Sequence, residues 1–263
     1  DWTYIYVPYC TGDLHWGNAT VTYAGGVTIE HRGAVNADAA ASWMQTALPK
    51  PDVLLVAGCS AGAYGSLLWG ARLAHTYVPR GTRLVQFGDS GVGVVTESFV
   101  RDAYPGWNTA AAFPWEIVPA EVAGGRTNDE LGTSGLSLLD LYGYAAAAYP
   151  TAMWSQYTSA YDENQAFFYE VMVDGNAKRG ETTLAQKVGW HQRMRAMYDA
   201  SSSALLDGST PNYAMWVAAG DEHCVIPYDR FWWRRAADGT ALSAWLQRMV
   251  DGEAVASVDC GGD

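Results

Sequence analysis

One glycine-rich turn places a serine in a setting typical of catalytic nucleophiles. Ser60 stands between Gly58 and Gly62 in a Gly-x-Ser-x-Gly pattern, after a continuous apolar run and before a helical pattern. Such a turn is sharp, and small residues beside the serine let strand and helix pack closely. The turn lifts the hydroxyl above the sheet, where the Ala61 N–H at the helix start can stabilise an oxyanion. The pattern therefore predicts acyl-transfer chemistry with Ser60 as the nucleophile.

A serine hydroxyl becomes nucleophilic when a base takes its proton, and histidine is the commonest base at neutral pH. His223 is the strongest of the five histidines, because it follows the last predicted strand. The order serine, acid, histidine along the chain is also that of α/β-hydrolases. His15 follows an earlier predicted strand and remains an alternative. The other three histidines occupy positions that fit packing within a helix or a strand.

The third group must orient the imidazole and stabilise its charged form, which a carboxylate does. Asp162 is the preferred residue, since it lies in the loop after the predicted strand 153–158. Asp89 remains an alternative, and so does Asp221, although Asp221 is too near His223 in sequence to reach comfortably across its ring. The side chains expected to line the site beside these groups are Asp13, His15, Trp16 and Asp89.

Two of the four cysteines flank the predicted nucleophile and base. Cys59 precedes Ser60 and Cys224 follows His223, so contact between the serine and the histidine brings the two cysteines together. We therefore expect a Cys59–Cys224 disulfide that fixes the two loops relative to each other. This disulfide and the many tryptophans and tyrosines favour a secreted protein from an oxidising compartment.

The other two cysteines, Cys10 and Cys260, are expected to bond each other or to lack a partner supplied from upstream. The four cysteines match no zinc-ligand spacing, so no structural metal is expected. The chain opens at Asp1 without an initiator Met or a signal-peptide pattern, which indicates a processed or truncated chain.

Short β-rich segments alternate with helical ones, which is typical of a mostly parallel α/β sheet with helices on both faces. The run 53–57 is continuously apolar, as in a strand buried on both faces. The stretch from about 105 to 150 is expected to form helical insertions over the site. The other predicted elements are strands at 4–9, 84–87, 153–158 and 213–218, a hairpin of 20–24 and 27–32, and helices at 36–48 (capped by Asn36), 64–75, 184–199 and 240–250.

Composition narrows the classes of partner. The 263 residues, 49% hydrophobic and 17% charged, suit one large α/β domain spanning the whole chain. The net charge of −12 argues against nucleic acid and anionic membrane surfaces as partners. Because no run of about 18 apolar residues is present, no membrane-spanning helix is expected.

Five motifs follow one another along the chain: Val7-Pro8-Tyr9-Cys10-Thr11-Gly12-Asp13, Gly58-Cys59-Ser60-Ala61-Gly62, Asp89-Ser90-Gly91, Tyr161-Asp162-Glu163-Asn164-Gln165 and Glu222-His223-Cys224. As a set they resemble the pectin acetylesterase/Notum family of carboxylesterases. The resemblance implies an α/β-hydrolase-like fold and a serine esterase without metal or cofactor. It also implies the triad Ser60, Asp162 and His223, with the Ala61 amide in the oxyanion hole.

The family also carries a strand and a Gly-rich loop ahead of the first of these motifs, and that loop supplies further oxyanion donors. We therefore expect an upstream segment of the same precursor, removed by processing, as a partner of this catalytic domain; the alternative is a protein that lacks these donors and whose activity is then in doubt. Loss of one such donor typically lowers the rate roughly 10²–10³-fold.

The resemblance indicates the reaction class better than the substrate. The expected substrates are acetyl esters on a polysaccharide, but the net charge of −12 repels polygalacturonate, which is itself an anionic polysaccharide. Neutral acylated polysaccharides, small acyl esters and polyesters avoid that repulsion. An esterase that acts on polyesters or on longer acyl esters is therefore the alternative function. Rival interpretations are a non-catalytic carbohydrate-binding protein with a hydrolase fold, and a serine peptidase or acyltransferase. The tryptophans that could stack on a sugar or an aromatic acyl group are Trp16, Trp107, Trp115, Trp232 and Trp233.

Overall fold

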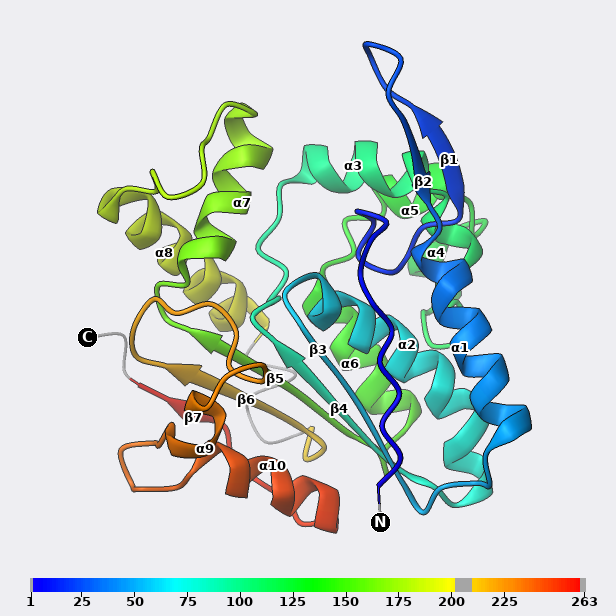
Figure 1. Ribbon diagram of the computed structural model, residues 1–263, viewed down its shortest axis with the longest axis vertical. Helices are drawn as coiled ribbons and strands as arrows, with labels where there is room; N and C mark the ends of the chain where they lie inside the picture. The colour runs from blue at the N-terminus through cyan, green and yellow to red at the C-terminus, as the bar shows by residue number, and fades with distance from the viewer. Residues whose placement is uncertain (1, 202–209, 261–263) are drawn as a thin grey trace.

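The computed structural model describes residues 2–201 and 210–260 and is built around one parallel sheet (Figure 1). Neighbouring strands pair in parallel along the whole sheet, and their order across it follows their order in the sequence. The architecture is α/β, as predicted. The strands are β3 (Val53–Cys59), β4 (Arg83–Asp89), β5 (Met153–Ser159), β6 (Tyr213–Ala218) and β7 (Val258–Asp259).

Helices cover both faces of this sheet, because alternate residues of its strands belong to two separate hydrophobic cores. In β4, Leu84 faces the larger core, whereas Phe87 faces the smaller one, together with α10 (Leu242–Asp251). This alternation explains why β3 and β6 are apolar at nearly every position. The helices that contribute to the larger core include α2 (Ala61–Tyr77), α6 (Leu138–Ala148) and α8 (Leu184–Ser201).

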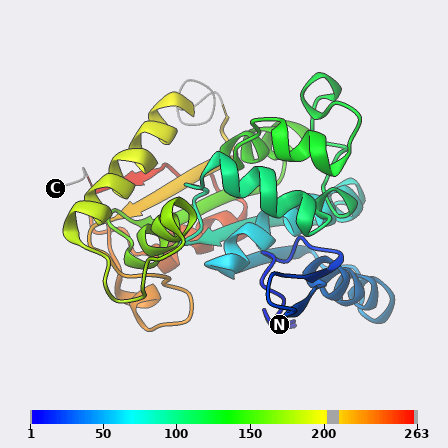
Figure 2. The same ribbon diagram turned by 90° about the horizontal axis from the view of Figure 1, so that it is seen from above.

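The predicted hairpin is confirmed as β1 (Ala19–Thr22) and β2 (Thr28–His31). The following helix, α1, spans Gly33–Ala47 and so begins before the predicted cap, Asn36. The reason is tertiary: the buried Asp13 carboxylate accepts the Gly33 N–H at 2.7 Å and satisfies the helix start. Seen from above, the hairpin and α1 lie at one end of the molecule and α8 at the other (Figure 2).

The strand predicted at 4–9 is wrong. This segment is extended, but it pairs with no strand among the described residues. Its alternation reflects exposure instead: Tyr4 is 83% and Tyr6 is 71% exposed, while Ile5 packs against the larger core. The alternation of side chains along this segment therefore arises because one side of it packs against the core, and not because it pairs with a neighbouring strand.

The stretch from 105 to 150 contains several short helices, and its position over the site stays a prediction. It follows α3 (Glu97–Gly106) and contains η2 (Thr109–Ala111), α4 (Ala120–Ala123), α5 (Asn128–Thr133) and α6. None of the described helices has the length and apolar content needed to span a bilayer. The elements that sequence patterns missed are chiefly α3, η1 (Val78–Arg80), α7 (Glu163–Asp174), α9 (Arg230–Trp233) and β7.

Candidate active site

Ser60 occupies a strained turn between β3 and α2. Its φ is +59° and its ψ is −120°, in the positive-φ region that a non-glycine residue adopts at a cost of about 1–3 kcal/mol. The backbone is held there by the Ser60 N–H, which donates to the Asp89 carbonyl at 2.7 Å. A side chain at Gly58 would collide with the Gly62 carbonyl, whereas one at Gly62 meets open space. The turn therefore requires glycine on the strand side only.

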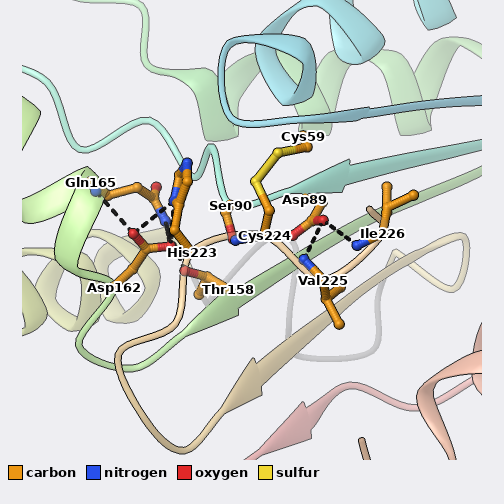
Figure 3. Close-up of a disulfide and its surroundings, with 10 residues drawn as sticks. All are labelled: Cys59, Asp89, Ser90, Thr158, Asp162, Gln165, His223, Cys224, Val225 and Ile226. Carbon is orange, nitrogen blue, oxygen red and sulfur yellow. Dashed lines mark hydrogen bonds and ion pairs between the residues drawn. A yellow bond between two sulfur atoms is a disulfide. The ribbon is translucent and has the colours of Figure 1, made fainter. Parts of the chain in front are cut away.

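A disulfide joins the loop that carries Ser60 to the loop that carries His223 (Figure 3). Cys59 and Cys224 are bonded, with their Cα atoms 5.8 Å apart, although they are separated by 165 residues in sequence. A ring nitrogen of His223 lies within 4.8 Å of both sulfurs. Because the sulfurs are bonded to each other, they do not act as metal thiolates, and their role is to hold the two loops together.

His223 and Asp162 are in direct contact. The imidazole Nδ1 lies 2.9 Å from Asp162 Oδ1 and 3.0 Å from Oδ2, and the carboxylate is completely buried. With Nδ1 carrying the proton towards the carboxylate, Nε2 has a lone pair available as an acceptor. Nε2 is buried and makes no hydrogen bond within the described residues, so Ser60 Oγ is not yet bonded to it.

Gln165 orients the carboxylate, and sequence reasoning had not assigned it a role. Asp162 is the N-cap of α7 and accepts the Gln165 N–H at 2.9 Å, while the Gln165 amide nitrogen donates to Asp162 Oδ2 at 3.0 Å. The same nitrogen donates to Thr158, and the amide oxygen accepts the Val92 N–H at 3.0 Å. An Asp followed three residues later by Gln resembles a capping signature, which would have been the signal for this residue.

Asp89 binds the loop beyond His223 instead of its ring. One oxygen of this fully buried carboxylate accepts the N–H groups of Val225 and Ile226, at 2.7 and 2.8 Å. Ser90 donates to the other oxygen and accepts the Cys224 N–H at 2.9 Å. Burial raises the pKa of Asp89 to about 6, and the two backbone hydrogen bonds oppose that rise.

An ion pair joins the acid loop to the base loop on the solvent side. The Lys187 ammonium lies 2.7 Å from Asp221 and 3.2 Å from Glu163, the residue after Asp162. The hydrogen bond to Asp221 is the main reason that the pKa of Lys187 is raised. Asp221, an alternative acid in the sequence analysis, is therefore engaged with a lysine.

The remaining side chains expected to line the site lie in the folded interior. Asp13 braces its own loop and the start of α1, accepting the His15 N–H at 3.1 Å as well as the Gly33 N–H. Trp16 is fully buried and donates its indole N–H to the Tyr64 carbonyl. His15 is also buried, and this desolvation lowers its pKa although Asp13 acts in the opposite direction.

Of the two alternatives for Cys10 and Cys260, the bond between them is not formed; both cysteines are free. Cys260 directly follows β7 at one edge of the sheet, whereas Cys10 belongs to the N-terminal segment on the side of β3, the opposite edge. Neighbouring strands are about 4.8 Å apart, so the width of the sheet separates the two thiols.

A groove of about 770 Å³ opens next to the loop that follows β4. Its walls come from that loop, α3, the turn after α5, and helices α7 and α8. Its lining mixes apolar side chains with polar ones, which include two arginines and one glutamate. The lining residues that carry this character are Val94, Val100, Leu136, Met197, Arg101, Arg193 and Glu97.

Comparison with known proteins found one family model and a solved structure that match this chain. The family model for pectinacetylesterase matches residues 1–105, which include Ser60 and Asp89. Among solved structures, the Wnt deacylase Notum from Drosophila shares the fold with a TM-score of 0.59 at 16% sequence identity. That match covers 95% of this chain and 68% of the other chain. No curated protein matches the chain.

The parallel sheet, the serine turn and the family match together define a carboxylic ester hydrolase with an α/β-hydrolase-like fold. The resemblance to the pectin acetylesterase/Notum family is thereby confirmed. Residues 1–105 thus resemble the pectinacetylesterases, and the fold of the chain resembles that of Notum.

Proposed function

We propose that this chain is a serine carboxylesterase that removes acyl groups, acetyl first among them, from a polysaccharide, with Ser60, His223 and Asp162 as its triad. The observation that carries the proposal is the contact of His223 with the buried Asp162 carboxylate, at 2.9 Å, together with the Cys59–Cys224 disulfide that ties the His223 loop to the serine turn. A buried acid, an oriented imidazole and a serine on a strained turn are the three parts that acyl transfer needs.

In the proposed reaction, His223 Nε2 takes the proton of the Ser60 hydroxyl as Oγ attacks the ester carbonyl carbon. The tetrahedral intermediate collapses, the carbon–oxygen bond to the alcohol breaks, and His223 returns the proton to the departing alcohol. Water then attacks the acyl-enzyme with the same imidazole as base, which releases the carboxylic acid and restores Ser60. Asp162 stabilises the imidazolium in both steps.

The Ala61 N–H supports the negative charge that develops on the carbonyl oxygen. Ala61 is the first residue of α2, and N–H groups of a first helical turn have no acceptor within the helix. They also lie at the positive end of the helix dipole, which favours an anion there.

The groove beside the loop after β4 is the proposed route for substrate. The first lining residue, Gly93, follows Val92, whose N–H donates to Gln165, and Gln165 in turn donates to Asp162 of the proposed triad. Its mixed apolar and charged lining suits a carbohydrate ester better than a long acyl chain. The net charge of −12 favours a neutral polymer over a polyanion.

Secretion is part of the proposal. The Cys59–Cys224 bond lies between two loops that must stay together for catalysis, and such structural disulfides persist in oxidising compartments.

The deciding experiment is covalent labelling with a fluorophosphonate followed by mass mapping, beside hydrolysis of p-nitrophenyl acetate. We expect the label on Ser60, and we expect Ser60→Ala to lose both labelling and hydrolysis while keeping its far-UV circular dichroism. A Ser60→Ala protein that still hydrolyses the ester excludes this mechanism. A wild-type protein that binds glycans but neither labels nor turns over supports the non-catalytic alternative.

A further inference from the structure

Three large aromatic side chains are exposed on the segment that follows the base loop. Tyr228 is 52%, Trp232 67% and Trp233 59% exposed, and they belong to α9 and the turn before it. Trp232 and Trp233 are adjacent in α9, and Tyr228 lies in the turn that leads into it, where its carbonyl accepts the Phe231 N–H. Surface clusters of large aromatic rings mark binding sites more often than accidental exposure does. We call these three residues the aromatic platform.

Neighbouring side chains contact each ring of the aromatic platform and restrict its movement. The Arg230 guanidinium lies 4.3 Å from the centre of the Tyr228 ring, and that of Arg234 lies 5.8 Å from the Trp233 ring. Phe231 contacts Trp232 edge to face at 5.0 Å and itself packs against the smaller core. Rings fixed before binding lose little conformational entropy when a ligand covers them.

The platform is also fixed relative to the candidate base. Arg234 is 14% exposed, and its guanidinium donates to Glu222 at 3.0 Å and to the Ala219 carbonyl at 3.2 Å. Glu222 directly precedes His223, so one side chain joins the platform to the loop of the triad. In both views α9 lies on the β7 side of the sheet, away from α1 (Figures 1 and 2).

The charges around the platform balance, unlike those of the whole chain. The stretch 222–240, which carries the platform, holds three arginines and three acids, whereas the chain carries a net charge of −12. A polyanion would therefore gain no net attraction here. The charged residues concerned are Arg230, Arg234, Arg235, Glu222, Asp229 and Asp238.

From these observations we propose that the aromatic platform binds the backbone of a neutral acylated polysaccharide while its ester reaches the candidate nucleophile. Pyranose rings present apolar C–H faces that pack on aromatic rings, while their hydroxyls stay hydrogen-bonded to water or to charged side chains at the rim. This inference rests on the proposed function for its ester substrate, but the platform's affinity for the polymer does not depend on turnover.

Binding is tested first in the Ser60→Ala background, where no ester is consumed. Affinity electrophoresis in gels containing acetylated glucomannan measures retardation for three proteins: Ser60→Ala alone, with Trp232→Ala and Trp233→Ala added, and with Trp43→Ala added. Trp43 is the matched control, because it is 51% exposed but lies on α1. We expect roughly tenfold weaker binding when the two platform tryptophans are removed, and no change for Trp43→Ala.

Kinetics then tests the role in catalysis. With Ser60 present, removal of the two platform tryptophans is expected to raise the KM for acetylated glucomannan roughly tenfold with little change in kcat. Equal retardation of all three proteins overturns the inference, and so does preferential retention by polygalacturonate or by polyester particles. Hydrolysis that persists in Ser60→Ala refutes the proposed function instead, and leaves the binding result standing on its own.

Discussion

The Asp89 carboxylate accepts the backbone N–H of Val225 at 2.7 Å and thereby fixes the loop that carries His223. Asp89 ends β4, and its own carbonyl accepts the Ser60 N–H. One residue therefore holds both the nucleophile turn, through its backbone, and the base loop, through its side chain. Its position explains how two segments distant in sequence keep a fixed separation.

We predict that the Asp89 carboxyl gives the protein a pH-dependent stability. Burial raises its pKa from 3.8 to about 6, so the folded protein binds this proton more tightly than the unfolded chain. The raised pKa adds about 3 kcal/mol to the free energy of unfolding below about pH 4, and this stabilisation is lost as the pH rises through 6. Urea unfolding of wild type and Asp89→Asn from pH 4 to 7 measures it: the wild-type stability minus that of the variant should fall with pH. A constant difference would contradict the shift.

Removal of the Cys59–Cys224 disulfide is predicted to lower both stability and activity. The bond closes a loop of 165 residues, for which chain entropy gives about 5 kcal/mol of stabilisation. The double variant Cys59→Ser, Cys224→Ser should melt at a lower temperature and lose esterase activity, because His223 is no longer held beside the serine turn. Cys10→Ser, Cys260→Ser is the control, since those thiols are free, and it should match wild type in both assays.

Gln165→Ala is predicted to lower kcat roughly tenfold with a small effect on KM, because a freed Asp162 carboxylate orients the imidazole less well. Gln165→Glu tests the same contact with a side chain of nearly equal size. It places a second carboxylate against Asp162 and removes the donor, so its loss should be larger at neutral pH. Steady-state kinetics on p-nitrophenyl acetate separates the two; wild-type kcat in both variants would show that Gln165 has no positioning role.

The two glycines of the Gly-x-Ser-x-Gly turn are predicted to differ sharply on substitution. Gly58→Ala forces a Cβ into the Gly62 carbonyl and should prevent the turn from forming, with loss of activity and of several degrees in Tm. Gly62→Ala places its Cβ in open space on a helix and should be tolerated within about 1 kcal/mol. Differential scanning fluorimetry and the ester assay on both variants check this contrast; equal damage would contradict it.

Local sequence determined the parts of this protein that depend on short-range physics. The continuous apolar run of β3, the small residues around Ser60 and the strand that ends before Asp162 each predict their own element, because burial and turn geometry leave a signal within a few residues. One long-range contact, the Cys59–Cys224 disulfide, was also predictable from the sequence. The two cysteines are the chain neighbours of Ser60 and His223, so contact between that serine and histidine brings the cysteines together.

Only the tertiary structure decided which buried polar groups meet. Tyr4–Tyr9 alternates like a strand but finds no ladder partner, and nothing local encodes the absence of one. Asp13 and Asp89 both follow β-like runs in the sequence, yet one starts a helix and the other holds the base loop. A buried carboxylate must accept hydrogen bonds, and tertiary packing decides which N–H groups lie within reach. For Asp13 and Asp89 those donors are distant in the sequence.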